Sequence, residues 1–242
     1  MTKELYLSIA ALFFLSLLIA AQSGERPTYS VVHTSAQIEI DGSPNEPAWK
    51  SAQLIEYFVD NFTGEKRGPE TEARILYDDN FLYFAFECKD DNLWATFRNR
   101  DEHLWTEEVV EVFLQADPNH PNYIELEVNP LNTMLDIYLL DIRKPLKYES
   151  WNSADLKWAV ALDGNVDGKP GDRGWSCEIA LPFDDVVTAP NIPPRPGDRW
   201  RMNLYRVEEK PEPQSLTWAP TLQRDFHVPS KFGDIIFEKK GN

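Results

Sequence analysis

The sequence predicts an all-β protein, an antiparallel sandwich of two sheets with immunoglobulin-like or jelly-roll architecture. From Ile38 onward, short segments alternate apolar and polar residues, and clusters of Pro, Gly, Asp and Asn separate them. A two-residue period bounded by turn-forming residues is typical of half-buried strands. Strand-like segments continue on both sides of the proline-rich stretches, so we expect a single domain over residues 28–240.

The first half of this domain contains four strand-like segments: 81–90, 109–115, 123–130 and 134–141. In YIELEVNP the apolar residues Ile124, Leu126 and Val128 point to one face, and the two glutamates point to the other. In VVEVFLQ the same alternation separates Glu111 from Val110. The last two segments are close enough along the chain to form a hairpin.

The second half contains four more such segments: 156–162, 174–182, 199–208 and 232–238. In GWSCEIALP the residues Trp175, Cys177 and Ile179 share one face, and Glu178 points to the opposite face. The first two of these segments are expected to pair. The proline-rich stretches APNIPPRPGDRW and EEKPEPQS are predicted to be long loops within the domain.

Several strands carry polar side chains on the face opposite their apolar one. These residues are Glu111, Glu125, Glu127, Asn129, Glu178, Arg201 and Asn203. If the strands are neighbours, these side chains form a hydrogen-bonding wall. The alternative is the ordinary solvated outer face of a sandwich.

Residues 1–22 have the layout of a secretory signal peptide. Lys3 precedes an apolar run from Leu5 to Ala21, and small and polar residues follow the run. A run of about 17 residues is at the lower limit for a bilayer span, so an uncleaved anchor is the alternative. We therefore expect a secreted or periplasmic protein with no other contact with the membrane.

The formal net charge of −16 restricts the partners of this protein. A surface this acidic repels nucleic acid and anionic lipid, because both carry phosphate groups. A neutral ligand or a cation fits better, and we expect a monomer. In an oxidising compartment Cys88 and Cys177 are allowed to form a disulfide, with two buried free thiols as the alternative.

The segment DGNVDGKPGDRG resembles the first half of a calcium-binding loop. Asp163, Asn165 and Asp167 occupy the first, third and fifth positions, but Gly174 stands at the twelfth, where a bidentate glutamate is required. A polar hairpin connection is therefore one prediction for this segment. A structural calcium ion held with the help of Asp172 is the other.

Trp105, which precedes the strand-like segment at 109–115, suggests sugar binding. Sugars present apolar C–H faces ringed by hydroxyl groups, so a sugar site needs an aromatic plate with polar groups at its edges. Trp105 followed by Glu111 on a polar strand face meets this requirement. Packing of the tryptophan over the end of the sandwich is the alternative.

Six stretches of the chain follow one another in a familiar order. They are IEIDGSPNEPAW (38–49), ARILYDDNFLYFAFECKDDN (73–92), LWTEEVVEVFLQADP (104–118), YIELEVNP (123–130), RGWSCEIALPF (173–183) and FHVPSKFGDIIF (226–237). The ordered set spans nearly the whole domain and resembles carbohydrate-binding module family 9.

The resemblance implies a β-sandwich without catalytic machinery, often with calcium in its peripheral loops. It also implies that the end of a sugar chain is held between two aromatic side chains, Trp105 and Phe226. Glu111 matches a carboxylate that binds sugar hydroxyls, and Glu127 falls where such members have a basic residue. Phe226 stands where a tryptophan would offer a larger face.

We therefore predict non-catalytic carbohydrate binding in polysaccharide breakdown, with no required cofactor. The predicted ligand-binding residues are Trp105, Phe226, Glu111, Glu127, Asn129, Glu178 and Asn203. Hydrolysis of glycosides is one alternative, because Glu125 and Glu127 lie about 6.7 Å apart on a strand, within the loose range of inverting glycosidases. Haem binding is another alternative, because related sandwiches carry haem. The sequence has no Cys-x-x-Cys-His motif for haem attachment. The available axial ligands are Met134, Met202, His33, His103, His120 and His227.

Overall fold

The computed structural model of the protein describes residues 26–141, 146–148 and 151–239. The predicted signal peptide, residues 1–22, and residue 240 lie outside the described residues. The helices of the described part are short 3-10 helices: η1 (Pro47–Ser51), η2 (Leu104–Thr106), η3 (Phe183–Asp185) and η4 (Pro229–Lys231). None of the helices within these ranges is long and apolar enough to cross a membrane.

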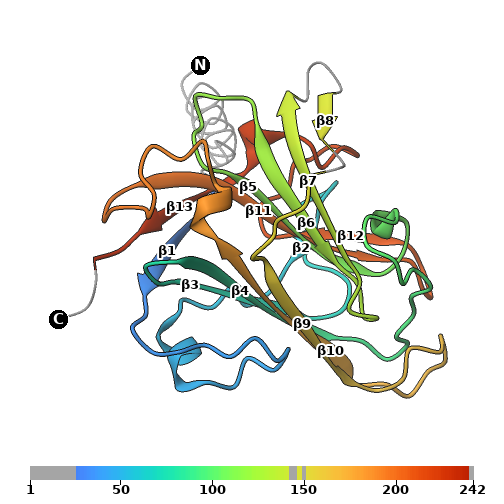
Figure 1. The fold of residues 1–242 in the computed structure, drawn as a ribbon. Helices are drawn as coiled ribbons and strands as arrows, with labels where there is room; N and C mark the ends of the chain where they lie inside the picture. Colours follow the sequence, from blue (N-terminus) through green and yellow to red (C-terminus); the bar gives the residue numbers. More distant parts are fainter. Residues whose placement is uncertain (1–25, 142–145, 149–150, 240–242) are drawn as a thin grey trace, which may run out of the picture.

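The strands form two sheets, which lie one above the other in Figure 1. The first sheet has the order β8 (Leu146–Tyr148), β7 (Met134–Asp141), β6 (Tyr123–Val128), β5 (Val109–Gln115), β11 (Arg199–Glu208) and β13 (Gly233–Phe237). A branch from β11 adds β12 (Gln214–Thr217) and β2 (Val59–Asp60). The second sheet has the order β3 (Thr71–Tyr77), β4 (Phe81–Lys89), β10 (Gly174–Pro182) and β9 (Lys157–Asp163).

The first strand, β1 (Thr28–His33), joins the two sheets. Its residues 28–31 pair with β13, and Val32 and His33 pair with β3. Both pairings are parallel, whereas the other pairings between described strands are antiparallel. The predicted all-β sandwich is confirmed, and so are the predicted pairs β6–β7 and β9–β10. The parallel seam at β1 was not predicted.

The core between the sheets is formed by the apolar strand faces that the sequence predicts. Val112 and Leu204 from the first sheet pack with Phe84 and Ile179 from the second, and all four are buried. Each such side chain contributes about 1.5–3 kcal/mol to stability when it is fully buried. This core holds the two sheets together and fixes which side of each strand faces outward.

Cys88 and Cys177 are free, buried thiols, so the second of the two predicted alternatives is confirmed and the disulfide is wrong. Cys88 lies opposite Trp175 in the β4–β10 pair, so Cys177 is its diagonal neighbour on the same face. Diagonal positions are about 7–8 Å apart, and a disulfide requires Cα atoms within about 6.8 Å. Burial raises the pKa of the Cys88 thiol to about 12, so this thiol stays protonated and unreactive.

The outer face of the first sheet is neither solvated nor a uniform polar wall. A second apolar cluster covers it, built from β5, β6, β7 and β11 together with η2 and the segment before β13. Its buried members are Leu104, Val109, Phe113, Tyr123, Leu135, Ile137, Leu139, Tyr205, Val207 and Phe232. The predicted polar residues of this face are therefore enclosed, and their chemistry is that of buried groups.

Candidate functional site

Three glutamates lie within this outer cluster, on the two central strands β5 and β6. Glu111 pairs directly with Glu127, and Glu125 lies opposite Phe113. The exposed fractions of Glu111, Glu125 and Glu127 are 1%, 3% and 0%. We call these three residues the outer carboxyl cluster. Their proximity follows from the strand register, because Glu125 and Glu127 share the outward face of β6 and Glu111 has the same parity on β5.

Burial controls the protonation of the outer carboxyl cluster. Burial first, and then the charge of Glu125, raises the pKa of Glu111 well above its usual range. The pKa of Glu127 is also raised, by burial and then by Glu111 and Glu125, although the backbone N–H of Trp105 partly offsets this. Glu125 and Glu127 are hydrogen-bonded to each other, which requires a proton on one of them. The cluster is therefore a set of protonated and shared carboxyl groups.

Two half-exposed aromatic side chains flank the outer carboxyl cluster. Trp105 belongs to η2, and its ring stacks on that of His103 with a centroid distance of 4.5 Å. Phe226 stacks flat on Tyr205 at 4.3 Å with an interplanar angle of 2°, and Tyr205 pairs with Glu111 across β5 and β11. Both Trp105 and Phe226 pack against the outer apolar cluster. The two predicted plates thus lie on the same face as the carboxyl groups.

Sequence reasoning missed two residues of this face. Tyr205 supports Phe226, and its hydroxyl donates a hydrogen bond to the Phe226 carbonyl oxygen at 2.9 Å. His227 stacks on Phe113 at 5.2 Å, hydrogen-bonds to the Tyr123 hydroxyl, and has Nδ1 3.8 Å from Glu125 Oε2. The parity of β11 already placed Tyr205 on the outer face. The position of His227 depends on how its loop folds, which no spacing in the sequence shows.

The structure gives the predicted residues Asn129 and Asn203 structural roles. Asn129 accepts backbone N–H bonds from Leu131 and Thr133 and donates to the Phe97 carbonyl, which closes the turn after β6. Asn203 donates to the Ala219 carbonyl and accepts from the Ala219 N–H and from a threonine hydroxyl. Both amides are fully buried and hydrogen-bonded within the protein.

The prediction that Glu178 lies beside the other polar residues is wrong. Its strand, β10, belongs to the second sheet, because strand parity alone does not specify which sheet a strand joins. Glu178 accepts hydrogen bonds from the backbone N–H groups of Asp41 and Gly42 and from the Trp49 indole. Burial raises its pKa to about 7, with Glu46 adding to the effect. Glu178 thus fixes the N-terminal loop onto the second sheet.

The three aspartates of the predicted calcium loop have separate partners. Asp163 forms an ion pair with Arg173, and Asp167 forms one with Lys169. Asp172 accepts the backbone N–H groups of Asn165 and Leu93 instead. The segment is a polar connection between β9 and β10, and the bound calcium ion stays a prediction.

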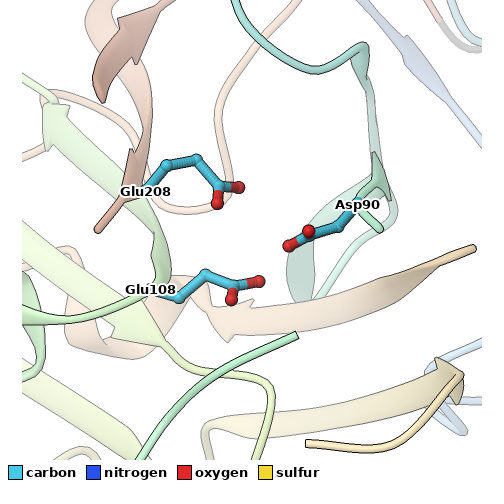
Figure 2. Close-up of side chains that lie close together, drawn as sticks. All are labelled: Asp90, Glu108 and Glu208. Atoms are coloured by element: carbon cyan, nitrogen blue, oxygen red, sulfur yellow. The ribbon is translucent and has the colours of Figure 1, made fainter. Parts of the chain in front are cut away.

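A different acidic cluster has the geometry of a metal site. Within the described ranges, Asp90, Glu108 and Glu208 are the only group of three or more His, Cys, Asp or Glu residues whose ligand atoms all lie within 4.8 Å of one another. Figure 2 shows their carboxylates directed toward one another from three separate chain segments. Burial, and then the charge of Glu208, raises the pKa of Glu108 to about 10, and burial raises that of Glu208 to about 7. We call these three residues the inter-sheet carboxylate cluster.

The candidate haem ligands are scattered. Met134 and Met202 are buried in the core between the sheets. His33 lies beside Tyr77 and Asp79, and His120 beside Asp117. His103 and His227 lie on the outer face, against Trp105 and Phe113. These positions give the six residues separate structural surroundings instead of one shared pocket.

Comparison with known proteins identifies the group to which this sandwich belongs. The sequence profile of carbohydrate-binding family 9 matches residues 48–237. The chain belongs to carbohydrate-binding family 9. No curated protein sequence matches it. The resemblance seen in the sequence is therefore confirmed, and the non-catalytic nature of family-9 modules agrees with a binding function and not with glycoside hydrolysis.

Solved structures share the fold. A candidate carbohydrate-binding protein from Bacteroides uniformis aligns over 88% of this chain and 100% of its own, with a TM-score of 0.73 and 19% identity. A family-9 module from Caldicellulosiruptor kristjanssonii in complex with cellotriose aligns over 89% of this chain and 96% of its own, with a TM-score of 0.62 and 14% identity. The same module in complex with glucose gives a TM-score of 0.61. At these identities the likeness shows a common family-9 fold.

Proposed function

We propose that this protein binds carbohydrate, without catalysing a reaction, on the outer face of its first sheet. The observation that carries the proposal is the placement of two half-exposed aromatic side chains, Trp105 and Phe226, beside the outer carboxyl cluster. An aromatic ring covers the apolar face of a pyranose, and carboxyl groups accept and donate hydrogen bonds to its hydroxyls. Glu111 Oε1 is buried without a hydrogen-bond donor, and a sugar hydroxyl would supply one.

The ligand meets the aromatic side chains first. Trp105 and Phe226 are accessible, whereas Glu111 and Glu127 are buried beneath the covering segments. Direct hydrogen bonds to the carboxyl groups therefore require η2 to move outward. Glu107 anchors the base of this segment, because its carboxylate accepts the backbone N–H groups of Thr96 and Phe97. The movement would thus be confined to the short stretch around Trp105.

Glucose-based oligosaccharides are the first ligands to test. The structural neighbour from Caldicellulosiruptor kristjanssonii binds cellotriose and glucose. This chain has an acid, Glu127, in the buried cluster where the resemblance implies a basic group, and this acid is protonated or shares a proton. A protonated carboxyl group can donate a hydrogen bond to a hydroxyl of a neutral sugar, but it lacks the positive charge that would attract an acidic sugar. A neutral ligand is therefore favoured over an acidic one.

Calorimetric titration with cellotriose and related oligosaccharides tests the site. We expect Trp105→Ala to lower the affinity about 30-fold or more, because truncation of a central aromatic anchor costs about 2 kcal/mol. Trp158→Ala, on β9 in the second sheet, is the matched control and should leave the affinity unchanged. Equal affinities of the wild type and Trp105→Ala would show that the sugar binds elsewhere.

We also propose that the protein is exported, acts as a monomer and works in polysaccharide breakdown. The support for export is the leader-like sequence of residues 1–22. N-terminal sequencing of protein recovered from outside the cytoplasm should give a chain that starts near residue 23. A chain that still begins at Met1 would favour an uncleaved anchor. Sedimentation of the same material measures its oligomeric state.

A further inference from the structure

The inter-sheet carboxylate cluster lies where the two sheets meet at one end of the sandwich. Asp90 directly follows β4 of the second sheet, Glu108 directly precedes β5, and Glu208 ends β11 of the first sheet. Val109 pairs with Val207, so Glu108 and Glu208 are opposite one another at the next position. Like charges at opposite positions destabilise a sheet. This arrangement therefore requires a positive charge between the strands.

Arg206 supplies one positive charge, whereas the three carboxyl groups of the cluster would carry three negative charges if all were ionised. Its Nη2 lies 3.2 Å from Asp90 Oδ2 and also pairs with Glu208, and its Nη1 donates to Thr71 Oγ1 and the Lys89 carbonyl. The guanidinium is fully buried. When all three carboxyl groups are ionised, the single guanidinium leaves two negative charges in this buried place. Two charges are what a single divalent cation neutralises.

Glu108 has one carboxyl oxygen that no N–H or hydroxyl group of the protein reaches. The residue is 2% exposed, and its Oε2 accepts the backbone N–H of Trp94 at 2.9 Å. Its Oε1 is buried without a hydrogen-bond donor. Figure 2 shows this carboxylate directed toward those of Asp90 and Glu208. Glu108 and Asp90 are hydrogen-bonded carboxyl groups, which requires a proton between them, and a cation bound by both would take the place of this proton.

We propose that Asp90, Glu108 and Glu208 bind one divalent cation, with calcium preferred. Calcium takes six to eight oxygen ligands at 2.3–2.6 Å, so two oxygens that share the ion lie within about 5 Å of each other. The ligand atoms of the cluster meet this limit. A set of carboxylates without His or Cys disfavours zinc, and magnesium requires a stricter octahedron and keeps more of its water.

The ion would tie the second sheet to the first at the end where Trp105 is presented. Asp90 belongs to one sheet and Glu108 and Glu208 to the other, so the ion would form a bridge that the core does not provide. Glu108 is also three residues from Trp105. This role concerns the stability of the sandwich and does not rest on the proposed sugar binding.

The segment that resembles a calcium loop packs against this site without forming it. Asp172 Oδ2 accepts the Leu93 N–H, and the Gly171 N–H donates to the Asp91 carbonyl. These bonds hold the turn at residues 90–94, which carries Asp90 and the Trp94 N–H. The segment therefore supports the turn beside the proposed ion, while its own Asp163 and Asp167 form ion pairs elsewhere.

Thermal unfolding and calorimetric titration of the whole protein with calcium chloride, after treatment with EDTA, test the proposal. We expect one calcium ion per chain. The melting temperature should rise by roughly 5–10 °C at calcium concentrations about 100-fold above the dissociation constant. Magnesium chloride should give a smaller rise. The absence of binding heat and of a temperature shift would overturn the proposal, and an equal response to magnesium would overturn the calcium preference.

Two isosteric variants locate the ion. Glu108→Gln should fold in EDTA about as well as the wild type, because the amide is neutral like the protonated carboxyl group, but its calcium response should be lost. Glu111→Gln, a buried glutamate on the adjoining strand, is the matched control and should keep the full response. Asp90→Asn provides a second variant with the same expected loss. A response retained in both Glu108→Gln and Asp90→Asn, or abolished by Asp167→Asn, would contradict the assignment.

Discussion

The two buried acidic clusters of this protein have members only three residues apart, Glu108 and Glu111, yet their surroundings differ. In the outer carboxyl cluster, Glu111 and Glu127 lie in the middle of a sheet under an aromatic cover, with no guanidinium among their hydrogen-bond partners. In the inter-sheet cluster, Glu108 and Glu208 lie at the end of the sheet, and a buried arginine pairs with Glu208. Burial raises carboxyl pKa values in both clusters, but only the second cluster contains a buried arginine.

Residues that are adjacent in the sequence from Trp105 to Glu111 have different surroundings in the fold. In the stretch from Trp105 to Glu111, Trp105 is a half-exposed plate and Glu107 anchors the backbone of Thr96 and Phe97. Glu108 faces the inter-sheet cluster, and Glu111 faces the outer one. Carboxyl groups that are neighbours in the sequence are therefore placed by the fold in three different surroundings.

The largest expected effect comes from removing the positive charge of the inter-sheet cluster. Arg206→Ala leaves Asp90 and Glu208 buried without their partner, and breaking a buried ion pair in this way costs about 3–5 kcal/mol. Urea unfolding of the variant in EDTA measures this loss. A loss below about 1 kcal/mol would mean that the arginine is not required to balance these carboxylates.

The outer carboxyl cluster should make the protein less stable as the pH rises. Its carboxyl groups have raised pKa values in the folded state, so the folded protein holds protons that the unfolded chain releases above about pH 4.5. Between pH 5 and 8 each such group lowers the free energy of unfolding by at most about 1.4 kcal/mol per pH unit. The measurement is urea unfolding across this range in saturating calcium, which holds the other cluster constant.

Replacement of one outer carboxyl group provides the control for this pH effect. Glu127→Gln should flatten the fall in stability, because the amide has no proton to lose. An unchanged slope in the variant, or a wild-type stability that rises with pH over the same range, would show that these groups are ionised in the folded protein.

The smallest expected effect concerns the size of the second aromatic plate. Phe226→Trp enlarges the ring that stacks on Tyr205, and we expect cellotriose to bind about two- to five-fold more tightly, a gain below about 1 kcal/mol. Calorimetric titration measures the change. Affinity that is insensitive to both a larger ring and Phe226→Ala would remove Phe226 from the site.

The sequence predicts most of the fold because strand parity is a local property. The alternation in β5, β6 and β10 correctly separates core residues from outward ones. It does not show that β10 joins the other sheet, which is why Glu178 was misplaced, or that loops cover the outer face. Cys88 and Cys177 share a face but lie diagonally, a register detail that pattern alone does not resolve.

The metal-site geometry is the part least accessible from sequence. Asp90, Glu108 and Glu208 come from three separate points of the chain and meet only because β4 and β11 end where β5 begins. The local motif from Asp163 to Gly174 suggested calcium from spacing, but its side chains form ion pairs on the surface. Trp105 could be predicted as a site residue because its signal, an aromatic residue just before a polar strand face, lies within one short stretch of the sequence.

The most direct test of the proposed function is the indole N–H spectrum of the protein during titration with cellotriose. The chain has eight tryptophans, and Trp105→Phe assigns the signal of interest. We expect the Trp105 signal to shift progressively to saturation while that of Trp158, assigned in the same way, stays in place. Saturable binding that leaves the Trp105 signal unmoved would contradict a sugar site on this face.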